Sequence, residues 1–346
     1  MKRIQELIHQ EWTEFFPSSE QRTKYFMQNK TLISGDNSYY ICFCNFGRLL
    51  TEGAIFFLTN KDTTKSLIET TNFHYCSNTK KSGGCLFFHS RGEIVQNRIC
   101  SFNSKSSRGS MYCYVQVSGI AQFKNKILNS FISKSGYINE NEYINICLRN
   151  GEIEVNSINI SYTYIYSNSI LDMYYYNSPS SASFSTFSNN TDTYSISNSY
   201  SIYFSGSSET LFIKSCNYLS NNLHAIITAD HACVYFINCS FVKNTGRSCY
   251  FYHGFLGNTT FDGCYIDVSN PITKAHDSTI NVFFKNKVLN PVKIEIPNIS
   301  CEFAIPNSMD EEDNDEEIVY INRNMNNIKN IHLIFSQSFI VFSGLK

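Results

Sequence analysis

The most regular feature of the chain is a short pattern of apolar and polar residues that returns through its middle part. An apolar residue is followed by two polar or small residues, then by Cys, Ile or Phe, and often by another apolar residue two positions later. Clear copies occupy residues 73–76, 155–160, 184–187, 213–218, 236–241 and 261–266, with looser copies at 95–99 and 123–127. Such alternation is typical of short strands that bury one face.

The copies return at even intervals when the last strong apolar position of each is taken as an anchor. The anchors are Cys76, Ile99, Ile127, Ile158, Phe187, Cys216, Cys239 and Cys264, separated by 23, 28, 31, 29, 29, 23 and 25 residues. Turn-favouring residues precede several anchors by about seven positions, namely Gly92, Gly119, Gly151, Ser180 and Gly257. Another apolar run precedes each turn. Each repeat is therefore expected to contain a strand, a tight turn, a second strand and a polar loop of variable length.

Repeats of this length predict a solenoid. A strand of about five residues cannot bury its apolar face alone, whereas coils stacked about 4.8 Å apart pair their backbones and merge their inward side chains into one core. We therefore predict an all-β fold, a right-handed parallel β-helix over residues 31–300. A leucine-rich repeat would need a recurring L-x-x-L-x-L run, which the chain lacks. A β-sandwich would not require its strands to repeat in sequence.

The two ends of the chain depart from the repeat. Apolar residues in 3–16 fall close to one helical face and Pro17 follows, so residues 1–30 are predicted to form a short N-terminal helical cap over the open end of the solenoid. Residues 301–346 are predicted to hold an acidic loop at 310–317 and late strands at 318–321 and 331–342. An alternating strand is also expected around residues 292–296.

Composition and charge narrow the partners and the compartment. Aromatic residues make up 15% of the chain, charged residues only 16%, and the formal net charge is −1, so nucleic acid is not an expected partner. The N-terminus lacks the apolar core of a secretory signal, and the apolar stretch 331–345 is interrupted by polar residues, so no membrane span is predicted. These features favour a cytoplasmic location by default, with the 13 cysteines present as reduced thiols. No oligomeric state follows from them.

The coil period and pattern over residues 40–300 resemble the right-handed parallel β-helix proteins of the pectin-lyase-like superfamily. They look most similar to the Asn-, Ser- and Tyr-rich β-helix proteins of AT-rich protist genomes, and the chain shares that composition. The resemblance implies the fold and, because related proteins are often cell-surface molecules, a cell-surface location as an alternative. It also raises the question of carbohydrate chemistry.

The enzymes of this superfamily set a test that the sequence does not meet. Polygalacturonases use Asn-Thr-Asp, an adjacent aspartate pair, Gly-His-Gly and Arg-x-Lys, in that order. Residues 190–192 read Asn-Thr-Asp and 253–254 read His-Gly, but no aspartate pair lies between them and no Arg-x-Lys follows. Glycosidic cleavage needs two carboxylates, and pectate lyases need several aspartates for calcium, whereas Asp262 and Asp267 share one coil. We expect no catalytic residues and no enzymatic activity.

No cofactor or metal site is expected either. The densest group of potential ligands has a spacing that matches no zinc pattern, and it consists of His224, Asp230, His231 and Cys233. The pair Cys42 and Cys44 lies in an apolar run, which is more typical of packing than of ligation.

One outward-facing set of residues suggests binding. In the strand before each turn, residues 13 and 11 positions before the anchor should point outward. The resulting candidates are Tyr114, Gln116, Asn145, Tyr174, Tyr176, Tyr203, Ser205 and Thr228. Among them Tyr114, Asn145, Tyr174, Tyr176 and Tyr203 predict a flat platform of rings and amides for sugar rings or a peptide. The plain alternative is that a Tyr-rich chain places tyrosines there by composition alone.

Three functions fit this sequence. The first is a non-catalytic binding or structural protein that uses one face of the solenoid for glycan or protein contact. The second is a divergent polysaccharide lyase or glycoside hydrolase, which would require carboxylates clustered on one face. The third is an intracellular scaffold without a defined ligand.

Overall fold

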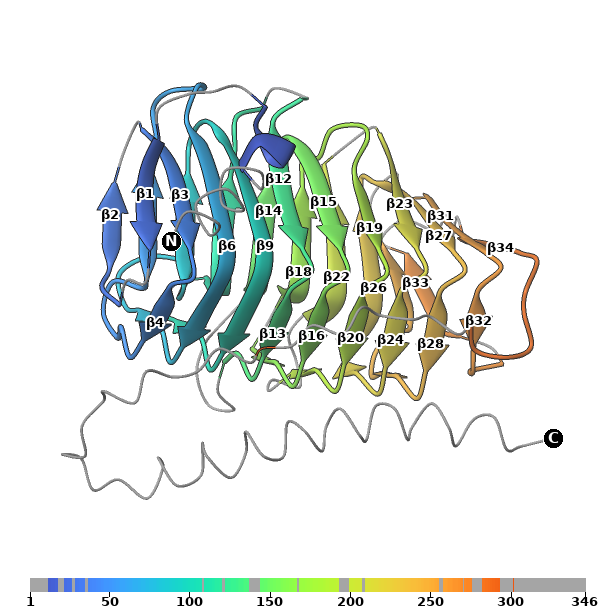
Figure 1. Cartoon of the computed structure of the whole chain (residues 1–346). Helices are drawn as coiled ribbons and strands as arrows, with labels where there is room; N and C mark the ends of the chain where they lie inside the picture. The colour runs from blue at the N-terminus through green and yellow to red at the C-terminus, as the bar shows by residue number, and fades with distance from the viewer. Residues whose placement is uncertain are drawn as a thin grey trace, which may run out of the picture. The chain divides into compact units, whose positions relative to one another are not determined.

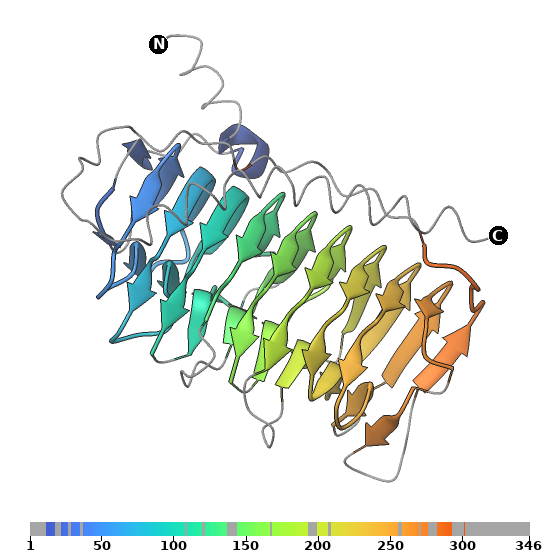
Figure 2. The same ribbon diagram turned by 90° about the horizontal axis from the view of Figure 1, so that it is seen from below.

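The chain folds into a parallel β-helix of about eight turns, as the sequence predicted. The computed structural model describes residues 12–17, 22–26, 29–34, 37–107, 109–119, 122–136, 144–166, 168–192, 199–206, 209–254, 258–269, 271–275, 282–292 and 301. The pairings between the strands of successive coils are parallel (Figure 1), and their register is continuous apart from one shift between β11 and β14. Figure 2 shows successive coils side by side along the solenoid axis. The predicted elements at 310–317, 318–321 and 331–342 lie outside the described residues.

Three strips of strands line the solenoid. The ten-stranded sheet consists of β2 (Leu32–Ser34), β5 (Ile55–Leu58), β8 (Leu86–His89), β11 (Ser110–Gln116), β14 (Ile144–Arg149), β18 (Asn168–Tyr174), β22 (Ser199–Ser205), β26 (Ala225–Asp230), β30 (Phe251–His253) and β33 (Thr273–Ala275). The eighteen-stranded sheet forms the other two strips. Its first strip consists of β1 (Arg22–Phe26), β3 (Ser38–Cys42), β6 (Lys65–His74), β9 (Glu93–Phe102), β12 (Lys124–Leu128), β15 (Glu152–Asn156), β19 (Ser181–Ser183), β23 (Thr210–Lys214), β27 (Cys233–Ile237), β31 (Asn258–Asp262) and β34 (Val282–Lys285).

The second strip of that sheet follows the first after a bend in the chain. The long strands β6 and β9 continue through this bend and belong to both strips. The other members are β4 (Asn45–Gly47), β13 (Phe131–Ser133), β16 (Asn159–Ser161), β20 (Thr186–Ser188), β24 (Asn217–Leu219), β28 (Ser240–Val242) and β32 (Tyr265–Ile266). Short sheets close the coil beyond it, formed by β7 (Ser77–Asn78) with β10 (Lys105–Ser106), and by β17 (Tyr164–Ile165), β21 (Thr191–Asp192), β25 (Asn222–Leu223) and β29 (Thr245–Gly246).

Two corners in each coil depend on a residue in the left-handed conformation. At the corner between the two strips, φ lies between 46° and 62° at Phe43, Thr70, Arg98, Asn129, Ser157, Phe184, Ser215, Asn238 and Gly263. The corner after the second strip uses Arg48, Tyr75, Asn103, Lys134, Tyr162, Asn189, Ser220 and Lys243. Only one of these residues is glycine, although an L-residue pays roughly 1–2 kcal/mol for this conformation. The stacking of coils therefore imposes the bend against local preference.

A row of small side chains supports the first corner from inside. The residue after each left-handed position is inward and register-matched through nine coils, at Cys44, Thr71, Ile99, Ser130, Ile158, Ser185, Cys216, Cys239 and Cys264. Where this residue is Cys, Ser or Thr it donates to the carbonyl two residues earlier, as Cys239 does to Ile237 at 3.4 Å and Ser185 does to Ser183 at 2.8 Å. The thiols and hydroxyls thus satisfy carbonyls at the bend.

The predicted anchors match this row only in part. Five of them occupy it, at Ile99, Ile158, Cys216, Cys239 and Cys264. The assignment was wrong for Cys76, Ile127 and Phe187, which are buried but lie on other inward rows. A left-handed residue breaks the period of two, so apolar residues on either side of a corner look equivalent in sequence.

An asparagine ladder supports the second corner in three successive coils. Asn190, Asn221 and Asn244 are buried, and each donates its Nδ2 to a backbone carbonyl at 2.7–3.2 Å. The Oδ1 of Asn221 accepts from the backbone N–H of Asn190 at 3.2 Å, and that of Asn244 accepts from Asn221 at 3.0 Å. Each amide therefore ties one coil to the next.

We expect Asn221→Ala to lower the free energy of unfolding by about 2–4 kcal/mol, because it leaves a buried N–H and a buried carbonyl unpaired. Asn222→Ala, at the exposed neighbouring position, is the matched control and should change it by less than about 0.5 kcal/mol. Chemical denaturation of both variants measures the difference. Equal losses would contradict the role of the ladder.

The N-terminal segment packs on the side of the solenoid. Residues 12–15 form a helical turn, and Trp12 and Phe16 are fully buried against Tyr40, Leu67 and Val95 on the outer surface of the first strip. The remaining residues of the predicted helix, 3–11, lie outside the described part. The first strand, β1, begins at Arg22, before the predicted start of the β-helix at residue 31. The described part of this segment thus covers the sheet surface rather than the end of the core.

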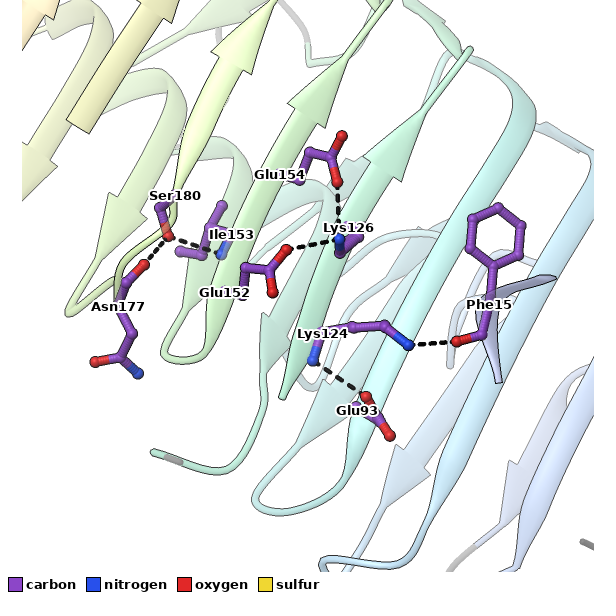
Figure 3. A network of polar contacts seen from close by, with 9 residues as sticks. All are labelled: Phe15, Glu93, Lys124, Lys126, Glu152, Ile153, Glu154, Asn177 and Ser180. Carbon is purple, nitrogen blue, oxygen red and sulfur yellow. Dashed lines mark hydrogen bonds and ion pairs between the residues drawn. The ribbon is translucent and has the colours of Figure 1, made fainter. Parts of the chain in front are cut away.

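Lys124, in β12, binds the helical turn at residues 12–15 to the sheet. Lys124 Nζ donates to the carbonyl of Phe15 at the end of the turn (Figure 3). The same Nζ lies 5.1 Å from the ring centroid of Phe16. A cation is favourable at the carbonyl end of a helix. Two residues later, Lys126 bonds Glu152 at 2.7 Å and Glu154 at 2.8 Å instead (Figure 3).

The single tryptophan of the chain, Trp12, reports on this contact. Lys124→Met removes the ammonium and should cost about 1 kcal/mol of docking, so the emission of Trp12 is expected to shift to longer wavelength at denaturant concentrations that leave the β-sheet circular dichroism intact. Lys126→Met is the control and should leave the emission unchanged. An unshifted Lys124→Met spectrum would show that apolar packing alone holds the turn.

One pair of cysteines departs from the expected reduced state. Cys100 and Cys301 form a disulfide with a sequence separation of 201 residues. The other eleven are free thiols, and all but the half-buried Cys233 are buried. The prediction that all thirteen cysteines are reduced thiols was therefore wrong for these two. Disulfides persist mainly in oxidising compartments.

Candidate functional site

The outer surface of the ten-stranded sheet carries two rows of side chains that follow the solenoid axis. The first row consists of Phe56, Phe87, Tyr114, Cys147, Asp172, Tyr203, Thr228, Tyr252 and Lys274. The second row lies two residues further along each strand and includes Leu58, His89, Gln116, Arg149, Tyr174, Ser205 and Asp230. We call these two rows together the aromatic face.

Three of the five predicted platform residues lie on this face. Tyr114, Tyr174 and Tyr203 point outward and are half-buried, and the rings of Tyr174 and Tyr203 have centroids 5.4 Å apart. The outward placement predicted from counting back from the anchors is therefore correct at these positions.

Asn145 and Tyr176 do not belong to the platform. Asn145 is fully buried and its Nδ2 donates to Thr163 Oγ1 at 3.4 Å inside the solenoid. Tyr176 lies in the core, because the preceding Tyr175 adopts φ 50° and reverses the alternation. Asn145 stands near the start of β14, where the pairing with β11 shifts register between Ser110 and Cys113. Both predictions were therefore wrong: at Tyr176 a left-handed residue breaks the period of two, and Asn145 turns inward beside a shift of strand register.

Sequence reasoning missed the members that make the face continuous. Phe56 stacks on Phe87 with centroids 4.9 Å apart, and Phe87 stacks on Tyr114 at 5.5 Å. His89 lies 6.0 Å from Tyr114 in a nearly parallel arrangement. The runs 55–58 and 86–89 alternate clearly enough to have shown them. Counting back from Cys76 does not reach residues 55–58, however, and counting back from Ile99 gives Leu86 and Phe88, one residue before Phe87 and His89.

Arg149 joins the two halves of the aromatic face. Its guanidinium carbon lies 5.3 Å from the ring centroid of Tyr114 and 4.9 Å from that of Tyr174. Such cation–π contacts are worth roughly 0.5–2 kcal/mol. Rings and guanidinium therefore form one continuous strip from Phe56 to Tyr203.

A buried polar group lies beneath this strip. Asp172 is fully buried, and its Oδ1 accepts from Ser169 Oγ. Burial raises the pKa of Asp172 well above its ordinary value, and the charge of Arg149 opposes the shift only in part. The adjacent Cys147 is also buried, and loss of hydration raises the pKa of its thiol to about 12. Cys147 is therefore a neutral thiol near neutral pH and not a reactive thiolate.

The far end of the face holds an aspartate, Asp230, that takes part in a chain of polar contacts. Tyr203 Oη donates to Asp230 Oδ2 at 3.1 Å, and His231 Nδ1 lies 3.0 Å from Asp230 Oδ1. A Cβ on Gly254 would stand 1.9 Å from that same oxygen, so only glycine leaves room for this carboxylate. The arrangement fixes the ring of Tyr203 on the sheet.

The residues weighed for catalysis and for metal binding are dispersed. Asp192, in the Asn-Thr-Asp segment, has a fully buried side chain that accepts from Arg247. Asp262 accepts from Tyr235 and Asn286, and Asp267 accepts from a backbone N–H. Within the described ranges no three His, Cys, Asp or Glu side chains are placed to share a metal ion. His224 lies in the bend between β25 and β26, whereas Cys233 is the first residue of β27.

No protein-family model and no curated protein matches the sequence. Among the described residues, no helix has the length and apolar character that crossing a membrane requires. Function must therefore be argued from the aromatic face itself.

The raised pKa of Asp172 gives a stability prediction with a defined sign. The unfolded carboxyl ionises near pH 4 whereas the folded one resists ionisation, so wild-type stability falls as pH rises above about 4. Asp172→Asn keeps a neutral group of the same shape. We expect the variant to match the wild type at pH 4 and to be more stable at pH 7, measured as the midpoint of thermal unfolding.

Asp267→Asn, at an exposed position, is the control and should show no pH-dependent gain. The groups that face Asp172 are Arg149, Cys147, Tyr174 and Tyr203, and none of them titrates between pH 4 and 7 in the folded state. A variant that loses stability at pH 7 would show instead that Asp172 is ionised and paired with Arg149.

Proposed function

We propose that this protein is a non-catalytic binding protein, and that its aromatic face holds an elongated ligand, a glycan chain, along the solenoid axis. The observation that carries the proposal is the continuous strip from Phe56 to Tyr203, which crosses six successive coils and consists of half-buried rings joined at the fourth coil by the guanidinium of Arg149. Aromatic rings provide a large contact area with few rotatable bonds, which suits the flat apolar faces of sugar rings.

The rigidity of the face supports this proposal. Its rings are stacked on one another and are held by Arg149 and Asp230, so little conformational freedom is lost when a ligand binds. A solenoid also presents equivalent positions at each coil, which matches the repeating units of a polymer. A ligand of several residues would contact several coils at once and gain affinity from each.

A depression on the face offers a place for one unit of such a ligand. It is shallow and open to solvent, has a volume of about 320 Å³, and is lined by Lys80, Lys81, Ser82, Phe87, His89 and Tyr114. It combines an aromatic floor with polar groups at one side, the usual composition of a small-ligand site.

The carboxylates favour binding over cleavage. Glycosidic hydrolysis needs an acid and a second carboxylate on either side of the bond. On the aromatic face Asp172 is buried beneath the rings and Asp230 is engaged by Tyr203 and His231. We also propose that the chain is a pectin-lyase-like β-helix protein. Because that superfamily includes enzymes that cleave polysaccharides, a divergent polysaccharide lyase or glycoside hydrolase is the alternative function. The parallel coils of 23 to 31 residues support that kinship.

Glycan-array binding of the purified protein tests the proposal. The double variant Tyr174→Ala, Tyr203→Ala should reduce affinity for any bound oligosaccharide by about tenfold or more, equivalent to about 1.4 kcal/mol. Tyr235→Ala is the control, because Tyr235 is an outward tyrosine on the other sheet. Glycan binding that survives the double variant, or is lost equally in the control, would overturn the assignment of the aromatic face.

A further inference from the structure

The loop beside the depression is held in a fixed shape. Asn78 Oδ1 accepts from the backbone N–H of Lys80 at 3.0 Å and of Lys81 at 2.8 Å. Ser106 Oγ donates to the carbonyl of Lys81 at 2.9 Å from the next coil. An asparagine that caps a turn in this way fixes its backbone. The backbone of Lys80 and Lys81 is therefore held in one conformation beside Phe87 and Tyr114.

Positive charge gathers around this loop although the chain as a whole has a net charge of −1. Lys80 pairs with Glu52 at 3.2 Å, but both side chains are largely exposed and such a pair exchanges readily with a ligand. Lys81 is exposed and has no hydrogen-bonding or ionic side-chain partner among the described residues. The guanidinium of Arg149 lies over the neighbouring ring of Tyr114. A concave surface lined by one sign of charge concentrates ions of the opposite sign.

The positive charges near this loop also affect the pKa of His89. Its ring stacks on Phe87 at 5.7 Å and faces the depression. Partial burial, and then the charges of Arg149 and Lys81, lower the pKa of His89. An anion placed here would offset those charges and favour the protonated imidazole.

We propose that this depression is an anion subsite of the aromatic face, which takes a sulfate or phosphate ester carried by a sugar ring. The ring lies on Phe87 and Tyr114, and the ester oxygens are bound by Lys80, Lys81 and His89. The inference rests on the proposed glycan binding and specifies the class of glycan.

The number and placement of the donors favour a tetrahedral ester over a carboxylate. The loop supplies two lysines to the lining of the depression, and β8 supplies one histidine. A sulfate or phosphate ester presents three terminal oxygens in different directions, whereas a carboxylate presents two in one plane. Three donors from two directions therefore match the ester.

Isothermal titration with a sulfated oligosaccharide, its phosphorylated counterpart, its desulfated parent and a uronate oligosaccharide of the same charge tests this subsite. The wild type should bind one of the esters about tenfold more tightly than the parent, an advantage that falls with added salt. Whichever of the two esters binds more tightly identifies the anion. In Lys81→Ala the advantage should disappear while affinity for the parent remains unchanged.

Lys287→Ala is the matched control, since Lys287 is an exposed lysine in the last described coil. It should keep the full advantage of the ester. Histidine NMR provides a second measurement: the pKa of His89 should rise when the ester binds and stay in place with the parent.

The outcomes separate this inference from the proposed function. Equal affinity of the wild type for the ester and its parent, or for the ester and the uronate, would overturn the tetrahedral-anion subsite and leave glycan binding intact. Failure of all four ligands to bind would overturn both. Loss of the ester advantage in Lys287→Ala as well would reduce the effect to non-specific attraction and would also overturn the subsite.

Discussion

The structure depends on the parallel backbone pairing between successive coils. Each strand finds its partner one coil away, so no coil can form its hydrogen bonds or bury its inward face alone. The pairing is in register, and it forces chemically different residues into the same place in each coil. It holds non-glycine residues such as Thr70 and Phe184 in the left-handed conformation, which their own preferences oppose. The stable unit is therefore the whole stack of coils and not a single coil.

The corners explain much of the unusual composition. Cysteine, serine and threonine alternate at the first corner because each can donate to the carbonyl two residues earlier, and Cys216, Cys239 and Ser185 do so in the same geometry. Asparagine serves the second corner because its amide both donates to and accepts from the backbone. Four of the buried cysteines, Cys44, Cys216, Cys239 and Cys264, are thus explained by the hydrogen bond that their thiols donate at the bend.

A core fixed in this way leaves the outer rows free to carry function. On the ten-stranded sheet, aromatic residues, Arg149 and small buried groups share two rows, and the register places them against one another without any loop having to close. Lys80 and Lys81 then add charge from a loop that Asn78 fixes to the same coil. Binding chemistry is thus displayed on a rigid support, which is why we place it on this face.

The sequence by itself determined the class of fold, because an apolar pattern that returns every 23 to 31 residues can bury itself only by stacking. It also placed Tyr114, Tyr174 and Tyr203 on the outer surface, since strict alternation holds within a strand. Only the tertiary structure decided where that alternation breaks. The left-handed Tyr175 turned Tyr176 into the core, and Asn145 lies inside next to the register shift between β11 and β14. The neighbours across coils, such as Arg149 between two tyrosines or Cys100 bonded to Cys301, likewise arise from register and chain path, which no local pattern encodes.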